Sequence, residues 1–169
     1  MTMENRPPSE SGAPKGKTRF YKKSTFVTHL PVTYLYTPSH YWLHEVSAGL
    51  WQVGMTRFST RMLGNLVDFG FEAARDSAVS VGRIIGWIEG FKAITDVYCV
   101  GDGTFVRTNP LMDNDMEAGW KDNYRSGWFY EFHGTPDPRA MDVDTYAGIL
   151  DTTIDKILEQ QKNEENTGT

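Results

Sequence analysis

One lysine stands out by its surroundings in the sequence. Lys92 lies in the segment EGFKA (89–93), between the apolar run RIIGWI and the alternating stretch ITDVYCV. Exposed turns usually carry Gly, Asn, Asp or Ser, whereas here Phe91 and Ala93 flank the lysine. A lysine amine can be acylated, and its long side chain can hold an attached group away from a rigid support. Lys92 is therefore a candidate for covalent attachment, although an ordinary surface lysine also fits the spacing alone.

The flanking segments predict the support that such a lysine needs. If residues 83–89 pair with 94–100, they form a β-hairpin whose turn is Gly90–Ala93, with Lys92 at the tip. An apolar Phe91 at that tip indicates a surface that another protein contacts. Glu89 lies three residues before the lysine, where a modifying enzyme could recognise its charge.

The rest of the chain predicts a mainly β fold, a sandwich or barrel. Period-two alternation typical of short strands occurs, with glycine-containing turns, in residues 41–46, 50–56, 65–71, 82–89, 93–100, 103–108 and 127–132. Residues 56–64 favour a short internal helix, with Thr56 as a possible N-cap and Gly64 as its terminator. Residues 142–158 place apolar side chains at helical spacing after a capping Asp142 or Asp144, which predicts a C-terminal helix packed on the sheet.

Length and composition predict one domain with two tails. A chain of 169 residues with 39% hydrophobic residues can bury one core. Residues 1–23 are basic and begin with a stretch rich in Pro, Ser and Gly, so we expect a disordered N-terminal tail. Residues 161–169 have a similar polar composition, and we expect a second disordered tail there. The folded domain is then predicted to span residues 24–160.

Charge and composition narrow the function classes. The net charge is −5, and residues 1–23 hold six basic and two acidic residues, so the rest of the chain is strongly acidic. An acidic body repels a phosphate backbone, which argues against a nucleic-acid partner. The sequence has no apolar run of membrane-spanning length and no secretory signal at its start, and Cys99 is its single cysteine. We therefore expect no membrane partner and a location in the cytoplasm.

Other residues that could do chemistry have simpler explanations. His40 and His44 are four apart, but they fall on or beside a predicted strand with no third ligand, so we expect no metal site. No Ser/His/Asp order, phosphate-binding loop or pair of carboxylates suggests an independent enzyme. Trp120 falls in a predicted loop, where we expect it to contact a partner.

The segment around Lys92 resembles the attachment loop of lipoyl carriers. Glu89-x-x-Lys92-Ala93 followed by Asp96 is similar to the Glu-Ser-Val-Lys-Ala loop of glycine cleavage system H proteins. Further matches to that family follow in the same order: YTPSHYW (36–42), VGMT (53–56), LGNLV (63–67), Asn109 and GW (127–128). The resemblance covers roughly residues 34–134.

The resemblance implies a fold, a cofactor and partners. The fold would be a barrel-sandwich hybrid of two small antiparallel sheets. Lys92 would carry lipoic acid in amide linkage, added by a lipoate-protein ligase or lipoyltransferase that recognises Glu89 and the loop residues Gly90, Phe91, Ala93 and Asp96. The protein would be a shuttling substrate of its partner enzymes rather than a catalyst, and a flavin disulfide oxidoreductase would reoxidise its arm.

Two departures from the family pattern bear on the cargo. Tyr41 stands where H proteins have a glutamate near the loaded arm, and the short helix carries Arg57 and Arg61 where acidic or histidine residues are common. Without those acidic residues, the cleft suits a neutral or anionic sulfur-bound cargo better than a cationic aminomethyl group. The chain in this respect resembles the lipoate-binding proteins of heterodisulfide-reductase-like sulfur oxidation, which we rank above glycine cleavage. The alternative to a carrier is a protein of another functional class, an unmodified interaction module with the same fold.

Overall fold

The computed structural model describes residues 16–167, which form eleven strands and four helices. The strands are β1 (Thr18–Lys23), β2 (Phe26–Pro31), β3 (Leu35–Tyr36), β4 (Tyr41–Ser47), β5 (Leu50–Met55), β6 (Leu66–Phe71), β7 (Ala78–Val79), β8 (Ile84–Gly90), β9 (Ile94–Tyr98), β10 (Gly101–Thr108) and β11 (Tyr130–Pro136). The helices are α1 (Arg57–Leu63), α2 (Pro110–Asn114), α3 (Met116–Lys121) and α4 (Val143–Thr167). No helix among the described residues is long and apolar enough to cross a membrane.

Two antiparallel sheets pack face to face and enclose the main core. One sheet has six strands in the order β3-β4-β5-β11-β10-β7, and the other has three in the order β6-β8-β9. Each sheet turns its apolar side chains inward, among them Leu43, Val53, Ile88, Val97 and Phe132. This is the alternation that the sequence predicts, and the predicted class, a mainly β barrel-sandwich fold with an internal and a C-terminal helix, is confirmed.

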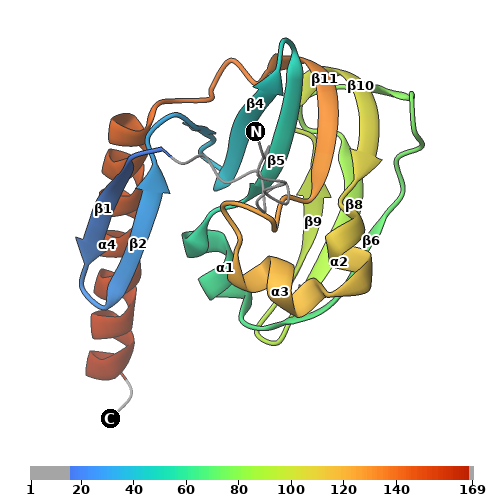
Figure 1. The fold of residues 1–169 in the computed structure, drawn as a ribbon. Helices are drawn as coiled ribbons and strands as arrows, with labels where there is room; N and C mark the ends of the chain where they lie inside the picture. The colour runs from blue at the N-terminus through green and yellow to red at the C-terminus, as the bar shows by residue number, and fades with distance from the viewer. Residues whose placement is uncertain (1–15, 168–169) are drawn as a thin grey trace, which may run out of the picture.

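A second core lies outside the two sheets, under α4. The β1–β2 hairpin and α4 lie together on one side of the molecule (Figure 1). Between them and the main body, α4 buries Tyr146 and Leu150, and the Tyr146 ring stacks on Tyr36 with centroids 4.7 Å apart. A fully buried side chain of this size contributes about 1.5–3 kcal/mol. The second core therefore fixes α4 and the hairpin firmly to the domain.

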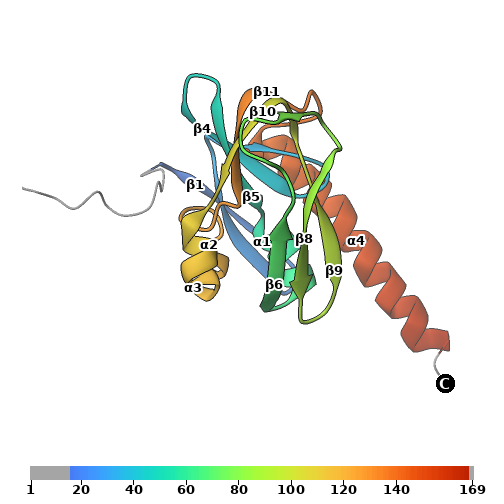
Figure 2. The ribbon, with the colours of Figure 1, turned by 90° about the vertical axis from the view of Figure 1, so that its right-hand side faces the viewer.

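Polar contacts align the β1–β2 hairpin with α4. Alternate residues of β1 face the helix, which gives the ion pairs Arg19–Asp144 at 3.3 Å and Lys23–Asp155 at 3.1 Å. Between these pairs, the Tyr21 hydroxyl donates to Asp151 at 2.7 Å. In the perpendicular view, α4 extends beyond the sheets (Figure 2).

The structure corrects the predicted tails. Thr18–Lys23 form strand β1 rather than part of a disordered tail, because β2 supplies its hydrogen-bonding partner and α4 covers Tyr21. Residues 161–167 continue α4 rather than forming a tail. The remainder of the two predicted tails, 1–15 and 168–169, lies outside the described residues.

Helix boundaries follow the capping residues in the sequence. Helix α1 begins after Thr56 and ends at Gly64, as predicted, although the Thr56 side chain makes no capping hydrogen bond. Of the two candidate caps of α4, Asp142 is the one that accepts a hydrogen bond from a backbone N–H, that of Thr145. The sequence analysis missed α2 and α3, where Asn109 and Asp115 provide the side-chain caps.

Candidate functional site

Lys92 lies at the tip of the β8–β9 hairpin. The strands pair from Ile84 and Tyr98 up to Glu89 and Ile94, so the predicted four-residue turn, 90–93, joins them. The Gly90 N–H donates to the Ala93 carbonyl at 2.8 Å across the base of this turn. The lysine side chain is exposed, as the sequence predicts for a displayed residue. The tip lies at the same end of the domain as α1 and α3 (Figure 1).

The turn is fixed to the rest of the domain as well as to its own strands. The Lys92 N–H donates to the Leu63 carbonyl, and the Phe91 N–H donates to the Asn65 carbonyl, both at 2.8 Å. Gly90 packs against the Leu63 carbonyl so closely that a Cβ would collide with it. The backbone beneath the lysine is therefore held at three consecutive residues, while the side chain projects from it.

The Lys92 side chain lies over Gly64, at the end of α1. A Cβ on Gly64 would be 3.0 Å from Cγ of Lys92. Nζ approaches the carbonyl oxygen of Arg61 at 3.4 Å, a long and exposed hydrogen bond. Lys92 forms no ion pair within residues 16–167, so its amine remains accessible to a modifying enzyme.

The acidic residues near the hairpin lie on the outer face of the three-stranded sheet. Glu89 is half-buried and sits directly opposite Asp68 of β6. Asp96 sits opposite Trp87, whose indole covers Gly70. Glu89 and Asp68 have like charges on paired positions, which destabilises a sheet. Packing within the sheet therefore does not explain this pair.

Large apolar side chains surround the tip. Phe91 is 83% exposed and Ile94 is 69% exposed, and Met62 at the end of α1 is also exposed. Single exposed apolar residues are common on protein surfaces, whereas several beside one lysine indicate a contact surface. The predicted exposure of Phe91 is thus observed.

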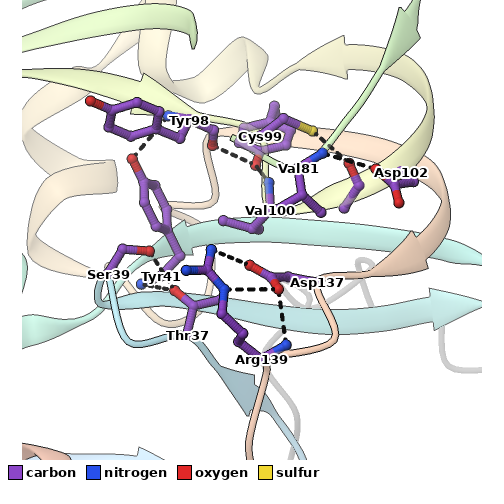
Figure 3. Close-up of polar contacts among 12 residues, drawn as sticks. Thr37, Ser39, Tyr41, Val81, Tyr98, Cys99, Val100, Asp102, Asp137 and Arg139 are labelled. Atoms are coloured by element: carbon purple, nitrogen blue, oxygen red, sulfur yellow. Dashed lines mark hydrogen bonds and ion pairs between the residues drawn. The ribbon is translucent and has the colours of Figure 1, made fainter. Parts of the chain in front are cut away.

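Tyr41 lies in a depression on one side of α1, which we call the neutral cleft. It has a volume of about 240 Å³, and its lining includes Tyr41, Met55, Met62 and Tyr98. None of its lining residues carries a charge at neutral pH. The Tyr41 hydroxyl accepts a hydrogen bond from the backbone N–H of Tyr98 at 3.1 Å (Figure 3). Burial raises the pKa of Tyr41 to about 12, so its hydroxyl stays neutral.

Arg57 lies on the other side of α1, in a depression of about 420 Å³ that we call the cationic groove. Arg57, Arg61, Lys92 and Lys121 are the charged residues of its lining, and Phe91 and Trp120 are the aromatic ones. The structure therefore separates Tyr41 from Arg57, two residues that the sequence analysis assigned to one cleft or partner surface. Lys92 borders the cationic groove and is absent from the lining of the neutral cleft.

Arg61 and Trp120 make contacts that the sequence does not predict. The Arg61 guanidinium donates to the backbone and hydroxyl oxygens of Thr25, and the Arg61 carbonyl oxygen lies 3.4 Å from Nζ of Lys92. Trp120 lies in α3, not in a loop, and is 7% exposed. Its Nε1–H donates to the Gly64 carbonyl at 3.1 Å, directly below the lysine. Because this contact joins residues 56 apart, no local sequence signal could have found it.

The remaining candidate residues are structural. The sulfur of Cys99 is buried, and burial raises the pKa of its thiol, which makes it a poor nucleophile. His40 bonds the Tyr146 hydroxyl through Nδ1 at 2.7 Å, and burial lowers its pKa to about 4. Among residues 16–167, no group of three or more His, Cys, Asp or Glu side chains could hold a metal ion. An ion pair between Asp137 and Arg139 fixes the loop after β11 (Figure 3).

A barrel-sandwich domain with a lysine exposed at a hairpin tip is typical of the proteins that carry a covalently attached cofactor. The comparisons identify the family within this class. The model of the glycine cleavage H-protein family matches residues 34–146, so the chain belongs to that family. Members of the family are lipoyl carriers rather than catalysts. The matched range omits β1, β2 and most of α4.

Individual relatives agree with the family assignment. The glycine cleavage system H protein of Corynebacterium jeikeium (strain K411) is 28% identical over 123 residues, which cover 71% of this chain and 96% of that protein. The H protein of Shewanella frigidimarina (strain NCIMB 400) is 26% identical over 125 residues, covering 72% and 96%. The crystal structure of an H protein from Mycobacterium marinum has a TM-score of 0.63 and 27% identity, and covers 70% of this chain and 97% of that chain.

Proposed function

We propose that Lys92 is the lipoylated residue of this carrier. The observation that supports the assignment most is the fixed turn backbone, bonded to the carbonyls of Leu63 and Asn65, below an exposed amine. A neutral lysine amine attacks an activated lipoyl acyl group, and a proton and the leaving group depart as the amide forms. A lipoate-protein ligase or lipoyltransferase would provide that acyl group.

The residues around Lys92 fit an attached lipoyl group. The amine is exposed and unpaired with any acidic side chain of the described residues, and open depressions lie on both sides of α1. When bound, the group supplies a dithiolane that can accept electrons or a transferred group at sulfur. The protein contributes position, because a tether on a rigid turn keeps the reactive end at an effective concentration on the order of millimolar for each partner.

Glu89, with the turn residues Gly90, Phe91 and Ala93 and the nearby Asp96, is proposed as the surface that the modifying enzyme recognises. Glu89 is half-buried beside the tip, and its position opposite Asp68 has no stabilising role in the sheet. The exposed Phe91 ring adds apolar contact area.

The proposed cargo is a neutral or anionic sulfur-bound group. A cationic aminomethyl adduct needs a negative partner in a sheltered site, and the neutral cleft offers only tyrosine, methionine, serine, threonine and leucine side chains. We therefore place the carrier in a heterodisulfide-reductase-like sulfur oxidation system in the cytoplasm. A flavin disulfide oxidoreductase is the proposed partner for reoxidising the arm.

Glycine cleavage is the second candidate, and it is supported by the relatives, which are named as glycine cleavage system H proteins. Incubation with glycine decarboxylase and glycine separates the two systems. We expect little aminomethyl loading of the lipoylated protein and stable binding to a sulfur-oxidising reductase complex. Efficient glycine-dependent loading would favour the glycine cleavage assignment instead.

Intact mass spectrometry tests lipoylation itself. The wild-type protein, co-expressed with a lipoate ligase and supplied with lipoate, should gain one lipoyl mass. Lys92→Arg should abolish the gain, whereas Lys121→Arg, which changes another lysine of the same groove, should retain it. A wild-type protein that stays unmodified while a known carrier in the same cells is lipoylated would support an unmodified interaction module.

A further inference from the structure

The cationic groove has a composition that suits an anion. Its lining comprises three kinds of side chain: the cations named above, the aromatic rings of Phe91 and Trp120, and small polar residues. No aspartate or glutamate lines it. The neutral cleft on the opposite side of α1 has no charge at all. The two depressions beside the hairpin therefore differ in the charge of the group that each would accept.

The lysine already points toward the cationic groove. Its stem crosses Gly64 and its Nζ lies near the Arg61 carbonyl, and both residues line this groove. Modification would convert the amine to a neutral amide and leave Arg57, Arg61 and Lys121 as the cationic residues of the groove lining. A group attached at Nζ therefore starts on the side of α1 that carries those positive charges.

The fold itself does not account for Arg57. It is the first residue of α1, whose first turn contains no acidic residue, and a cation near a helix N-terminus is electrostatically unfavourable. Its guanidinium forms no ion pair with any residue between 16 and 167. Lys121, in contrast, pairs with Glu117 at 3.0 Å. Arg61, the other arginine of the lining, donates to Thr25 and lies over the Phe26 ring. Arg57 is thus the principal cation available to a ligand in the groove.

The aromatic residues provide an apolar path between Lys92 and Arg57. Trp120 lies beneath the lysine, with its Nε1–H on the Gly64 carbonyl and its ring stacked on Phe129 at a centroid distance of 6.2 Å. Phe91 borders the same groove and is largely exposed. An alkyl chain that follows this path loses contact with water while its charged end reaches the guanidinium.

We infer that the cationic groove holds the lipoyl arm when its sulfur carries an anionic group, with the alkyl chain against Phe91 and Trp120 and the anion at Arg57. The inference rests on the proposed attachment at Lys92. It assigns Arg57 a role in distinguishing cargo by charge, since a neutral or cationic arm gains nothing from the guanidinium.

A matched pair of arm adducts tests this discrimination. The reduced lipoyl protein is alkylated with iodoacetate or with iodoacetamide; each thiolate displaces iodide and forms a thioether that ends in a carboxylate or in a neutral amide of similar size. The single cysteine, Cys99, is 1% exposed, so alkylation should be confined to the arm. Intact mass before alkylation confirms the lipoyl group on Lys92. A protein without the lipoyl mass at this stage would contradict the proposed function and would leave the role of the groove unaffected.

The readout is the nuclear magnetic resonance of two side chains, Trp120 Nε1–H and Arg57 Nε–H. The carboxylate adduct should shift both signals relative to the unalkylated lipoyl protein, and the amide adduct should shift them much less. Arg57→Gln should remove more than half of the Trp120 shift. Arg75→Gln, which removes an exposed arginine that is not part of the groove lining, should leave the Trp120 shift unchanged.

Three results would overturn the inference while leaving lipoylation intact. In the first, the two adducts shift the Trp120 and Arg57 signals equally. In the second, the carboxylate adduct shifts the methyl signals of Met62 and Met55 in the neutral cleft and leaves the Trp120 and Arg57 signals unchanged. In the third, neither adduct shifts any signal of the residues that line the two depressions, which would show that the arm remains in solvent.

Discussion

Lys92 lies directly over Gly64. The Gly64 φ is +79°, and a Cβ at this position would be 3.0 Å from Cγ and 3.4 Å from the backbone nitrogen of the lysine. One glycine therefore both ends α1 and leaves room for the lysine stem. The residue that positions the lysine is thus far from it in sequence.

Replacing this glycine should disturb the lysine. Gly64→Ala introduces a methyl group at a backbone conformation that suits glycine, which should lower the free energy of unfolding by about 1–3 kcal/mol. The methyl group also displaces the Lys92 stem, so the initial rate of lipoylation should fall several-fold. Chemical denaturation and intact mass over time measure the two effects.

Gly82→Ala is the matched control for Gly64→Ala. Gly82 also has a positive φ, +86°, but a Cβ there would meet nothing within 4 Å. The Gly82→Ala protein should be less stable than wild type but should be lipoylated at the wild-type rate. Equal lipoylation of all three proteins would show that the contact with Gly64 does not position Lys92.

Gly90→Ala should loosen the hairpin tip. Its Cβ would collide with the Leu63 carbonyl, the acceptor for the Lys92 N–H, so the turn must move away from α1. We expect a loss of about 1–3 kcal/mol and faster amide hydrogen exchange at Lys92. Gly148→Ala, at an open position in α4, should instead stabilise by about 0.5–1 kcal/mol. Unchanged exchange at Lys92 in Gly90→Ala would contradict the proposed docking of the turn.

Glu89→Gln should separate recognition from stability. Removing one charge of the Glu89–Asp68 pair should raise the free energy of unfolding by about 0.2–1 kcal/mol. Lipoylation should become slower, because the ligase is proposed to recognise the Glu89 carboxylate. Asp68→Asn relieves the same repulsion and retains Glu89. Competition assays with wild type measure the rates. If both variants are modified at the wild-type rate, Glu89 has no part in recognition.

His40 should make stability depend on pH. Burial lowers its folded pKa from 6.5 to about 4, so the unfolded chain binds the proton more readily. The contribution to stability is complete above about pH 6.5 and is lost as the pH falls toward 4, with an upper limit of about 3 kcal/mol. His40→Asn, which tolerates the φ of +70°, should flatten this dependence. The half-buried His44 contributes in the same direction and remains in the variant. If the free energy of unfolding of His40→Asn depends on pH as strongly as that of wild type, His40 is not the cause of the pH dependence.

Local patterns predicted much of the fold and of the site. Strand alternation located the β8–β9 hairpin, and the atypical Phe91 beside Lys92 marked its exposed tip. The capping residues Thr56 and Gly64 bounded α1. These features are set within a few residues, which is the range over which sequence patterns carry information.

Contacts between distant segments were not predictable in this way. β1 is stabilised by α4, which lies more than a hundred residues later in the sequence. The polar composition of residues 1–18 therefore led to the prediction of a disordered tail where β1 forms. Trp120 and Arg57 line the same groove as Lys92 only because α3 and α1 converge on the hairpin tip. The sequence also grouped Tyr41 with Arg57 as residues of an arm cleft or partner surface, and it could not show that they line separate depressions, since the face of α1 that each residue adjoins depends on tertiary packing.

The contact between Tyr21 and Asp151 joins residues 130 positions apart, which affects how the chain folds on the ribosome. Synthesis releases β1 and β2 before α4, so Tyr21, Phe26 and Leu30 emerge long before the helix that covers them. We expect the nascent chain to expose this stretch until α4 has been synthesised, which makes it a candidate contact for a chaperone that holds unfinished proteins.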